Sequence, residues 1–349
     1  MNSYETAHQR ISRLSKSRGR TWLVTGAAGF IGSHLAENLL ELGQTVVGLD
    51  NFSTGKRENL PAGLRFIEGD IRSLDTCQRA CQGVDVVLHE AALGSVPRSI
   101  DDPIASTQSN VDGFLNMLVA ARDAGVGRFV YASSSAVYGD HPALPKVETI
   151  TGRSMSPYGL TKQVNELYAD VFDVCYGLKT IGLRYFNVFG PRQDPNGAYA
   201  SVIPAWIGAL LRDQVPYVNG DGSAARDFCY IDNVVQANLL AATAEDPAAL
   251  GQAYNIALGD QTSLTELFDL IRDGVARRHA PAKHARAIHR EPRRGDLQFS
   301  RADISKAARL LGYRPAVRIM EGLDQTIDWY ADNLARDIEA ADERKVAHA

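Results

Sequence analysis

The chain has 349 residues, of which 45% are hydrophobic, and its formal net charge at pH 7 is −4. This length and apolar content allow two domains or one large interleaved α/β unit with a substantial core. The slightly acidic balance gives no reason to expect a nucleic-acid partner. No apolar run has membrane-spanning length, and the N-terminus lacks the apolar core of a signal peptide. We therefore expect a cytoplasmic protein that contacts neither nucleic acid nor membrane.

The four cysteines fit no disulfide framework and no paired zinc spacing, so we expect reduced thiols and no metal site. Cys77 and Cys81 lie four residues apart in a predicted helix, where packing is their expected role. Residues 1–20 form a polar, basic extension, for which a transit peptide is the alternative interpretation. Residues 331–349 are predicted to form a charged C-terminal tail.

A glycine-rich turn follows the first apolar run of the sequence. The run Trp22–Thr25 leads into Gly26, Gly29 and Gly32, and helical apolar spacing follows directly. A second run, which is rich in β-branched residues, then ends at Asp50. The order of strand, glycine turn, helix, strand and acid predicts the first βαβ unit of a dinucleotide-binding fold.

Each residue type in this unit has a physical role. Gly26 permits the sharp turn, Gly29 lets backbone N–H groups approach a pyrophosphate, and Gly32 lets the helix lie close to the strand. The helix N-terminus presents unpaired N–H donors and a positive dipole end to the phosphates. Asp50 can accept both ribose hydroxyls and would repel a 2′-phosphate, which favours NAD. The basic pair at residues 56–57 leaves NADP as the alternative.

Strands and helices alternate through the first half of the chain, which predicts a doubly wound parallel sheet of the Rossmann type. The further elements are strands at 64–70, 84–92, 128–133 and 180–187, helices at 104–124 and 158–175, and a return strand at 253–257. Ligands gather at the carboxyl ends of such strands. The candidate cofactor-binding residues are Gly26, Gly29, Phe30, Ile31, Gly32, Asp50, Asn51, Asp70, Ile71, Ala91, Ala92, Tyr158 and Lys162.

The candidate catalytic residues follow the fifth strand. Ser133, Ser134 and Ser135 place hydroxyls at the sheet edge, and only one of them need be catalytic. Tyr158 and Lys162 are four residues apart and share one helix face. A nearby ammonium and a positive nicotinamide ring would both lower the pKa of the phenol, which is about 10 when free. We therefore predict that Tyr158 is a general base and that Ser134 holds the substrate hydroxyl.

With these motifs the chain resembles the extended short-chain dehydrogenase/reductase family over about residues 21–330. Within that family it is similar to the UDP-hexose 4-epimerases, and in particular to the bacterial group that prefers acetylated sugars. The stretches that carry this similarity are residues 50–55, 91–99, 183–190, 192–199, 218–222, 226–232 and 293–296. The resemblance implies reversible C4 epimerisation of UDP-GlcNAc and UDP-GalNAc through a transient 4-keto sugar, which would supply surface polysaccharide precursors.

The resemblance also implies how the chain is divided. Residues 21–187 with about 228–260 would bind NAD, and about 188–227 with 261–330 would form a smaller interleaved α/β domain for the UDP-sugar. It further implies a homodimer built on the helices near 104–124 and 156–175. The substrate-binding residues that it implies, with those proposed above, are Gly94, Ser95, Ser133, Ser134, Ser135, Asn187, Gln193, Tyr217, Asn219, Arg226, Arg293, Asp296 and Ser300.

Ser300 bears on which sugar is bound. Related epimerases that are limited to glucose and galactose carry a bulky aromatic residue at the matching position. A small residue would leave room for a 2-acetamido group, and the alternative role of Ser300 is to cap the next helix. Three other functions stay open: epimerisation of the uronic acid sugars with Arg98 as carboxylate partner, dehydration, and non-catalytic NAD binding. Dehydration is disfavoured because Ser135 and Ala136 stand where related dehydratases carry an acid pair.

Overall fold

A seven-stranded parallel sheet forms the centre of the computed structural model, which describes residues 9–10, 12, 19–195, 200–291 and 299–347. The strand order is β11-β6-β5-β4-β1-β2-β3, and every pairing in this sheet is parallel. The predicted α/β fold class is therefore confirmed. The strands are β1 (Thr21–Thr25), β2 (Thr45–Asp50), β3 (Arg65–Glu68), β4 (Val86–His89), β5 (Arg128–Ser134), β6 (Thr180–Tyr185) and β11 (Gln252–Ile256).

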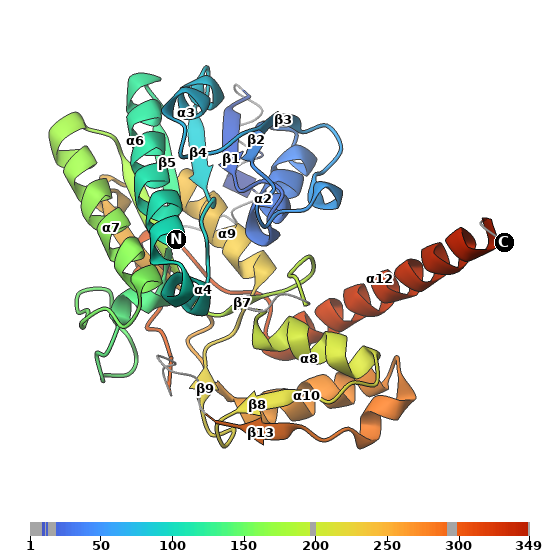
Figure 1. Cartoon of the computed structure of the whole chain (residues 1–349). Helices are drawn as coiled ribbons and strands as arrows, with labels where there is room; N and C mark the ends of the chain where they lie inside the picture. The colour runs from blue at the N-terminus through green and yellow to red at the C-terminus, as the bar shows by residue number, and fades with distance from the viewer. Residues whose placement is uncertain (1–8, 11, 13–18, 196–199, 292–298, 348–349) are drawn as a thin grey trace.

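Helices cover both faces of the sheet because neighbouring strand residues point to opposite sides. Trp22 and Val24 of β1 pack with α2 (Phe30–Glu41) and α9 (Ile231–Ala242), whereas Leu23 packs on the other face. That other face carries α3 (Leu74–Cys81), α6 (Gly113–Asp123) and α7 (Pro157–Tyr176), which stand side by side in Figure 1. Cys77 and Cys81 are buried there, as predicted.

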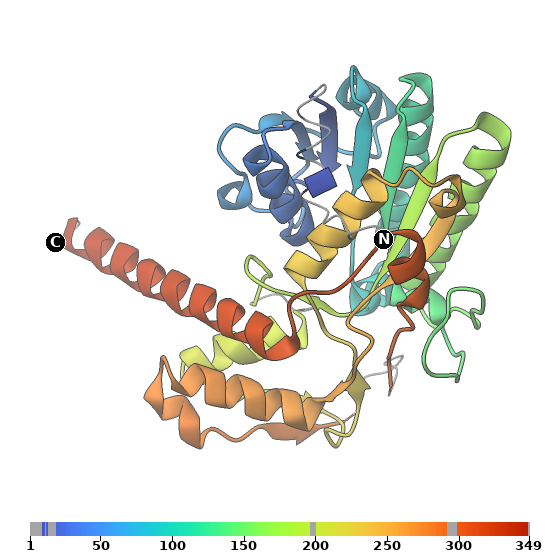
Figure 2. The ribbon, with the colours of Figure 1, turned by 180° about the vertical axis from the view of Figure 1, so that it is seen from behind.

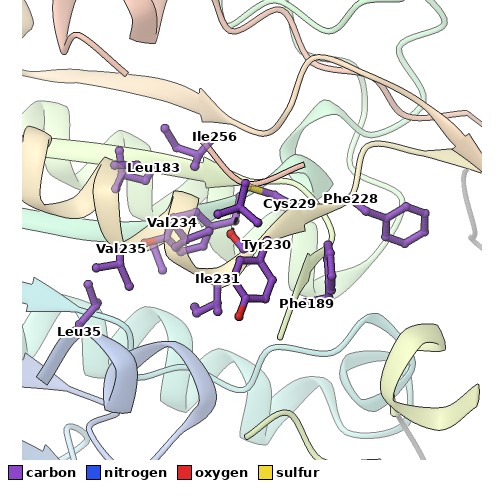
Figure 3. Packing of buried hydrophobic residues seen from close by; sticks show 14 of the residues in the cluster. Leu35, Leu183, Phe189, Phe228, Cys229, Tyr230, Ile231, Val234, Val235 and Ile256 are labelled. Carbon is purple, nitrogen blue, oxygen red and sulfur yellow. Dashed lines mark hydrogen bonds between the residues drawn. The ribbon is translucent and has the colours of Figure 1, made fainter. Parts of the chain in front are cut away.

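The larger core continues from the sheet toward a smaller unit. Figure 3 shows part of this core, with Leu183 of β6, Ile256 of β11 and Val234 of α9. Tyr230 and Phe189 belong to the same cluster and are also drawn there. The smaller unit contains α8 (Val202–Leu211), β8 (Tyr217–Asn219), α10 (Leu264–Ala276) and β13 (Ile288–Arg290), and it lies below the sheet in Figures 1 and 2. Two further pairs of short strands are present. β7 (Val188–Phe189) pairs with β10 (Cys229–Tyr230) in parallel, and β9 (Ala225–Arg226) pairs with β12 (Thr262–Ser263) in antiparallel orientation.

One predicted element differs in detail. The helix expected over 104–124 is built from α5 (Pro103–Thr107), a π-helical segment (Gln108–Asp112) and α6. The π turn lets the buried Asn110 side chain reach another chain segment, because its Oδ1 accepts from the Leu93 amide and its Nδ2 donates to the Leu93 carbonyl. Asn110 Nδ2 also donates to Thr161 of α7 at 3.2 Å. A hydrophobic pattern does not report such a local insertion.

Three further helices are present. They are α4 (Val96–Asp101), α11 (Ser305–Leu310) and α12 (Ile319–Ala347), the last of which continues through the predicted tail and projects from the body in Figure 2. Short 3-10 turns lie at Arg57–Asn59, Ser135–Tyr138, Pro247–Ala249 and Ala280–His284. Within the described part of the chain, no helix has the combination of length and apolarity needed to cross a bilayer.

Candidate active site

A cavity of about 560 Å³ lies at the carboxyl ends of the sheet strands. It is lined by the glycine turn after β1, the ends of β2, β4, β5 and β6, and the start of α7. All of the predicted cofactor-binding residues line it except Asp70. The predicted substrate-binding residues that line it are Gly94, Ser95, Ser133, Ser134, Ser135, Asn187 and Gln193.

The glycine turn is a close-packed cradle. Gly26 has a φ of +69°, and a Cβ placed there would lie 2.9 Å from the Ala91 amide nitrogen. A Cβ on Gly32 would lie 2.1 Å from the Gly26 carbonyl oxygen, which is an impossible contact. Helix α2 begins at Phe30 with no side-chain cap and no acid in its first turn. Its N–H groups and positive dipole end therefore suit a pyrophosphate, so these residues fit a dinucleotide.

Two of the predicted cofactor-binding residues, Asp50 and Asp70, are acids with different surroundings. Asp50 is buried at the end of β2, and its carboxylate accepts the Ala28 amide at 3.0 Å and the Phe52 amide at 2.7 Å. Asp70 instead pairs with Arg72 at 2.7 Å, and this contact lowers the pKa of Asp70 to about 2. Asp50 therefore lines the cavity, whereas Asp70 does not line it and its carboxylate is paired with Arg72.

Local contacts fix the start of α7 and thereby place Tyr158. The hydroxyl of Ser156 caps the helix by accepting the Gly159 amide at 3.1 Å. The buried Ser99 hydroxyl accepts the Tyr158 amide at 3.0 Å. One turn later, the buried Lys162 ammonium donates to the Ala132 carbonyl at 2.7 Å. The helical spacing of four residues therefore brings Tyr158 and Lys162 into one cavity, as predicted.

Only one of the three serines is hydrogen-bonded to the tyrosine. Ser134 ends β5 and makes a side-chain hydrogen bond with Tyr158. The hydroxyl of Ser133 donates instead to Glu166 Oε1 at 2.5 Å, and Glu166 pairs with Arg184 at 2.7 Å. Adjacent strand residues point in opposite directions, which explains this division.

The described residues alone raise the pKa of Tyr158, whereas the predicted lowering also relies on the positive nicotinamide ring. Burial raises the pKa of Tyr158, and the charge of Glu90 raises it further, against the lowering effect of the Ser134 hydrogen bond. Burial also lowers the pKa of Lys162 to about 8. The Lys162 ammonium lies 6.0 Å from the centre of the Tyr158 ring and points to a backbone carbonyl. The described residues alone thus favour the neutral phenol over the phenolate.

A second cavity of about 220 Å³ adjoins the smaller unit. Four of the predicted substrate-binding residues line it: Asn187, Tyr217, Asn219 and Arg226. Trp206 fixes one wall by donating to the Tyr217 carbonyl at 2.9 Å. Asn187 also lines the larger cavity, so this residue joins the two spaces. Two further predicted residues, Arg293 and Asp296, lie outside the described residues.

Ser300 lines neither cavity but lies close to the second one. It is 6% exposed, and its amide donates to the carbonyl of Ala225, the neighbour of Arg226, at 3.0 Å. The alternative role as a helix cap is wrong, because α11 begins only at Ser305. Asp303 binds that first amide at 2.8 Å.

The sequence interpretation missed Glu90, which lines the larger cavity immediately after β4. Its carboxylate accepts a hydrogen bond from the Tyr185 hydroxyl at 2.8 Å. The signal was present in the sequence, since an acid at the carboxyl end of a parallel strand lies where ligands gather. Tyr185 stands 95 residues away, so no local pattern could have indicated the pair.

Comparison with known proteins agrees with this geometry. The profile of the NAD dependent epimerase/dehydratase family matches residues 22–257. A putative UDP-glucose 4-epimerase of Methanocaldococcus jannaschii is 38% identical over 89% of this chain and 98% of its own length. A UDP-glucose 4-epimerase of Mycolicibacterium smegmatis is 39% identical over 88% and 97%. UDP-glucuronate 4-epimerase 4 of Arabidopsis thaliana is 34% identical over 94% and 79%.

Solved structures are similar over nearly the whole chain. Two of them have a TM-score of 0.84 and are 36% identical over 90% of this chain and 99% of their own chains. One is UDP-glucose 4-epimerase from Thermotoga maritima with UDP-glucose. The other is UDP-N-acetylglucosamine 4-epimerase from Methanobrevibacter ruminantium M1 in complex with UDP-N-acetylmuramic acid. The Thermus thermophilus UDP-glucose 4-epimerase complex with NAD has a TM-score of 0.79 and 35% identity over 89% and 98%.

The chain therefore belongs to the NAD dependent epimerase/dehydratase family. The predicted cofactor, NAD, is confirmed at the level of the family, and the glycine cradle and Asp50 fit it.

Proposed function

We propose that this protein is a UDP-sugar 4-epimerase that interconverts UDP-GlcNAc and UDP-GalNAc. The observation that carries the proposal is the group of Ser134, Tyr158 and Lys162 in one cavity, next to a second cavity that contains Arg226. The first cavity suits the dinucleotide and the reacting sugar, and the second suits the uridine diphosphate. Four of the curated relatives and structures reported above are named UDP-glucose 4-epimerases, and a fifth is named a UDP-N-acetylglucosamine 4-epimerase.

The chain's own residues would handle the proton of the C4 hydroxyl. Bound NAD supplies a hydride acceptor and a positive ring beside the phenol. Ser134 would hold the C4 hydroxyl, and Tyr158 would take its proton and later return it. The positive ring would oppose the burial that raises the pKa of Tyr158. Lys162 would add positive charge while its ammonium stays fixed on the Ala132 carbonyl.

The nucleotide end of the substrate would be held while the sugar turns. Arg226 is 9% exposed and offers a planar fork for the diphosphate oxygens. Tyr217 is 42% exposed, with the Arg290 guanidinium 3.2 Å over its ring, and would lie along the uracil. Asn187 lines both cavities and would lie at the diphosphate. We also propose that the smaller unit is the UDP-sugar domain.

The acetylated sugar is favoured by the size of Ser300. Its buried position beside Ala225 places a small side chain next to the strand that carries Arg226. The alternative substrate is the uronic acid pair, which the UDP-glucuronate 4-epimerase among the relatives supports. Arg98 lies in α4, directly after Ser95, Val96 and Pro97, which line the larger cavity. A carboxylate on C6 would be its partner in that case.

We further propose a homodimer in the cytoplasm. Leu160, Leu167, Val171 and Val174 of α7 are 53%, 65%, 51% and 86% exposed. Their helical spacing places them on one stripe. Ile104 of the neighbouring α5 is 69% exposed. A second copy of this chain would cover this apolar face with the same face of its own.

A substrate panel tests the proposal. The purified protein is incubated separately with UDP-GlcNAc, UDP-Glc and UDP-GlcNAcA, with and without added NAD, and products are resolved by NMR. Formation of UDP-GalNAc well ahead of the other two products supports the acetylated sugar. Faster conversion of UDP-GlcNAcA would replace it with the uronic acid. Failure of all three with NAD present would overturn 4-epimerisation of these sugars.

A further inference from the structure

Glu90 is a half-buried acid in the cofactor cavity to which the proposed reaction assigns no role. Its Oε1 accepts the Tyr185 hydroxyl, which in turn accepts the Asn238 amide at 2.8 Å. Its Oε2 is buried and has no hydrogen-bond partner among the described residues. A buried carboxylate oxygen without a partner is costly, so an unpartnered one in a binding cavity calls for a reason.

The position of Glu90 identifies which part of the cofactor would lie near it. The Gly26–Gly32 turn suits the pyrophosphate, and Asp50 suits the adenosine ribose. The nicotinamide must therefore lie toward Tyr158 and Lys162, where the proton is handled. Glu90 lines that region of the cavity, and its charge acts on both Tyr158 and Lys162. Its backbone also lies against the turn, since a Cβ on Gly26 would approach the Glu90 carbonyl carbon to 3.1 Å.

We infer that Glu90 is a cofactor-tuning residue whose carboxylate favours the oxidised, positively charged nicotinamide over the reduced, neutral one. In the proposed reaction a hydride leaves C4 for the nicotinamide ring, and the hydroxyl proton leaves for Tyr158. The ring gains two electrons and loses its positive charge, and C4–OH becomes a carbonyl. The return step reverses all of these transfers. A negative group beside the ring favours the positive ring with C4–OH over the neutral ring with the C4 carbonyl. It therefore favours return of the hydride to C4 and completion of the cycle.

The groups around Glu90 influence whether its carboxyl group is ionised. Burial raises the pKa of Glu90 to about 7, and the Tyr185 hydrogen bond and the charge of Lys162 oppose that rise. A positive ring nearby would further favour the ionised carboxylate, and the carboxylate would favour the positive ring to the same extent, because such coupling is reciprocal.

A competition experiment tests this inference without any sugar. The protein is equilibrated with mixtures of NAD⁺ and NADH at known ratios, free nucleotide is removed by rapid gel filtration, and the bound nucleotides are separated by chromatography. Replacing Glu90 by Gln keeps an oxygen for the Tyr185 hydroxyl and removes the charge. We expect E90Q to shift the bound ratio about tenfold toward NADH, which for a two-electron couple equals about 30 mV.

Three variants complete the experiment. E90D keeps the charge and is expected to stay within about threefold of the unaltered ratio. E90M removes the charge with a similar side-chain volume, and it provides a second removal if E90Q does not fold. E58Q removes an exposed acid that pairs with Lys56, and no shift is expected from it.

The inference rests on NAD binding and on the proposed placement of the nicotinamide, so a wrong sugar assignment leaves this readout unaffected. An unchanged NAD⁺ to NADH ratio in E90Q or E90M would overturn it.

Discussion

The hydroxyl of Ser134 hydrogen-bonds the phenol of Tyr158, whereas the hydroxyl of its neighbour Ser133 donates to Glu166. This division assigns the two serines different tasks. In the proposed mechanism, Ser134 would hold the substrate hydroxyl next to the base. Ser133 joins β5 to α7 through a carboxylate that also pairs with Arg184. The strand that carries Ser134 and the helix that carries Tyr158 are thereby fixed relative to one another.

Replacing Tyr158 by Phe is expected to lower turnover about 10²- to 10⁴-fold, because a positioned acid–base group contributes that much. Bound NAD should be retained, since the ring that lines the cavity is kept. Epimerisation rate and cofactor content measure the two effects. Tyr168→Phe on the same helix is the matched control and should keep the rate of the unaltered protein. A fully active Y158F would contradict the assignment of the base.

Replacing Gly32 by Ala is expected to destabilise the fold by about 3 kcal/mol and to weaken NAD binding, because the new Cβ would meet the Gly26 carbonyl. Denaturant unfolding and NAD titration measure these changes. Gly127→Ala is the control, since a Cβ there would lie 3.6 Å from the Asp85 carbonyl oxygen, an ordinary contact. Equal stability of the two variants would contradict the close packing of the turn.

Asp227 predicts a pH-dependent stability. It is fully buried, and its carboxylate accepts the amides of Leu258 and Gly259 at 2.9 and 3.0 Å. Burial nevertheless raises the pKa of Asp227 from 3.8 to about 6. The folded state therefore holds this proton more tightly, so its stabilisation is complete below pH 3.8 and is lost as the pH rises through about 6.

Unfolding by urea at pH 4, 5, 6 and 7 tests this point in the unaltered protein and in Asp227→Asn. The difference in unfolding free energy between the two should fall by about 1–3 kcal/mol between pH 4 and 7, which follows from a shift of about two pKa units. A difference that is constant across this range, or that grows with pH, would show that Asp227 does not bind its proton more tightly in the folded state.

Replacing Ser300 by Tyr is expected to lower activity on UDP-GlcNAc at least tenfold and to spare UDP-Glc, since the ring would fill the buried space beside Ala225. Ser300→Ala separates size from hydrogen bonding and should keep the preference if size alone decides. The ratio of kcat/KM for the two sugars is the measurement. An unchanged ratio in S300Y would remove Ser300 from the explanation of specificity.

A double replacement of Leu167 and Val171 by Glu tests the apolar stripe on α7. Both residues are more than half exposed, so the monomer fold should tolerate the acids, whereas four buried charges at a symmetric interface should separate the copies. Light scattering after gel filtration gives the mass. A dimer that survives both substitutions would place the interface elsewhere, and a monomeric unaltered protein would refute the dimer itself.

Much of the site could be predicted from the sequence because its signals are local. The three glycines, Asp50, and the Tyr158–Lys162 spacing each depend on residues within one βαβ unit or one helix turn. What could not be predicted depends on long-range contacts. The partner of Ser133 is 33 residues away, the partner of Glu90 is 95 away, and the π turn at 108–112 serves Leu93. The upward shift that the described residues give the pKa of Tyr158 could not be predicted either, because it comes from burial and from Glu90, which follows a different strand.

The most direct test of the central claim is the fate of the hydrogen on C4. UDP-GlcNAc carrying deuterium at C4 is converted to equilibrium in ordinary water, unlabelled UDP-GlcNAc is converted in D₂O, and both products are examined by NMR. If the hydrogen is taken from C4 and returned to it within the cavity, the labelled UDP-GalNAc keeps its deuterium, and the product formed in D₂O gains none at C4. Loss of the label to water, or its entry from D₂O, would contradict transient oxidation at C4.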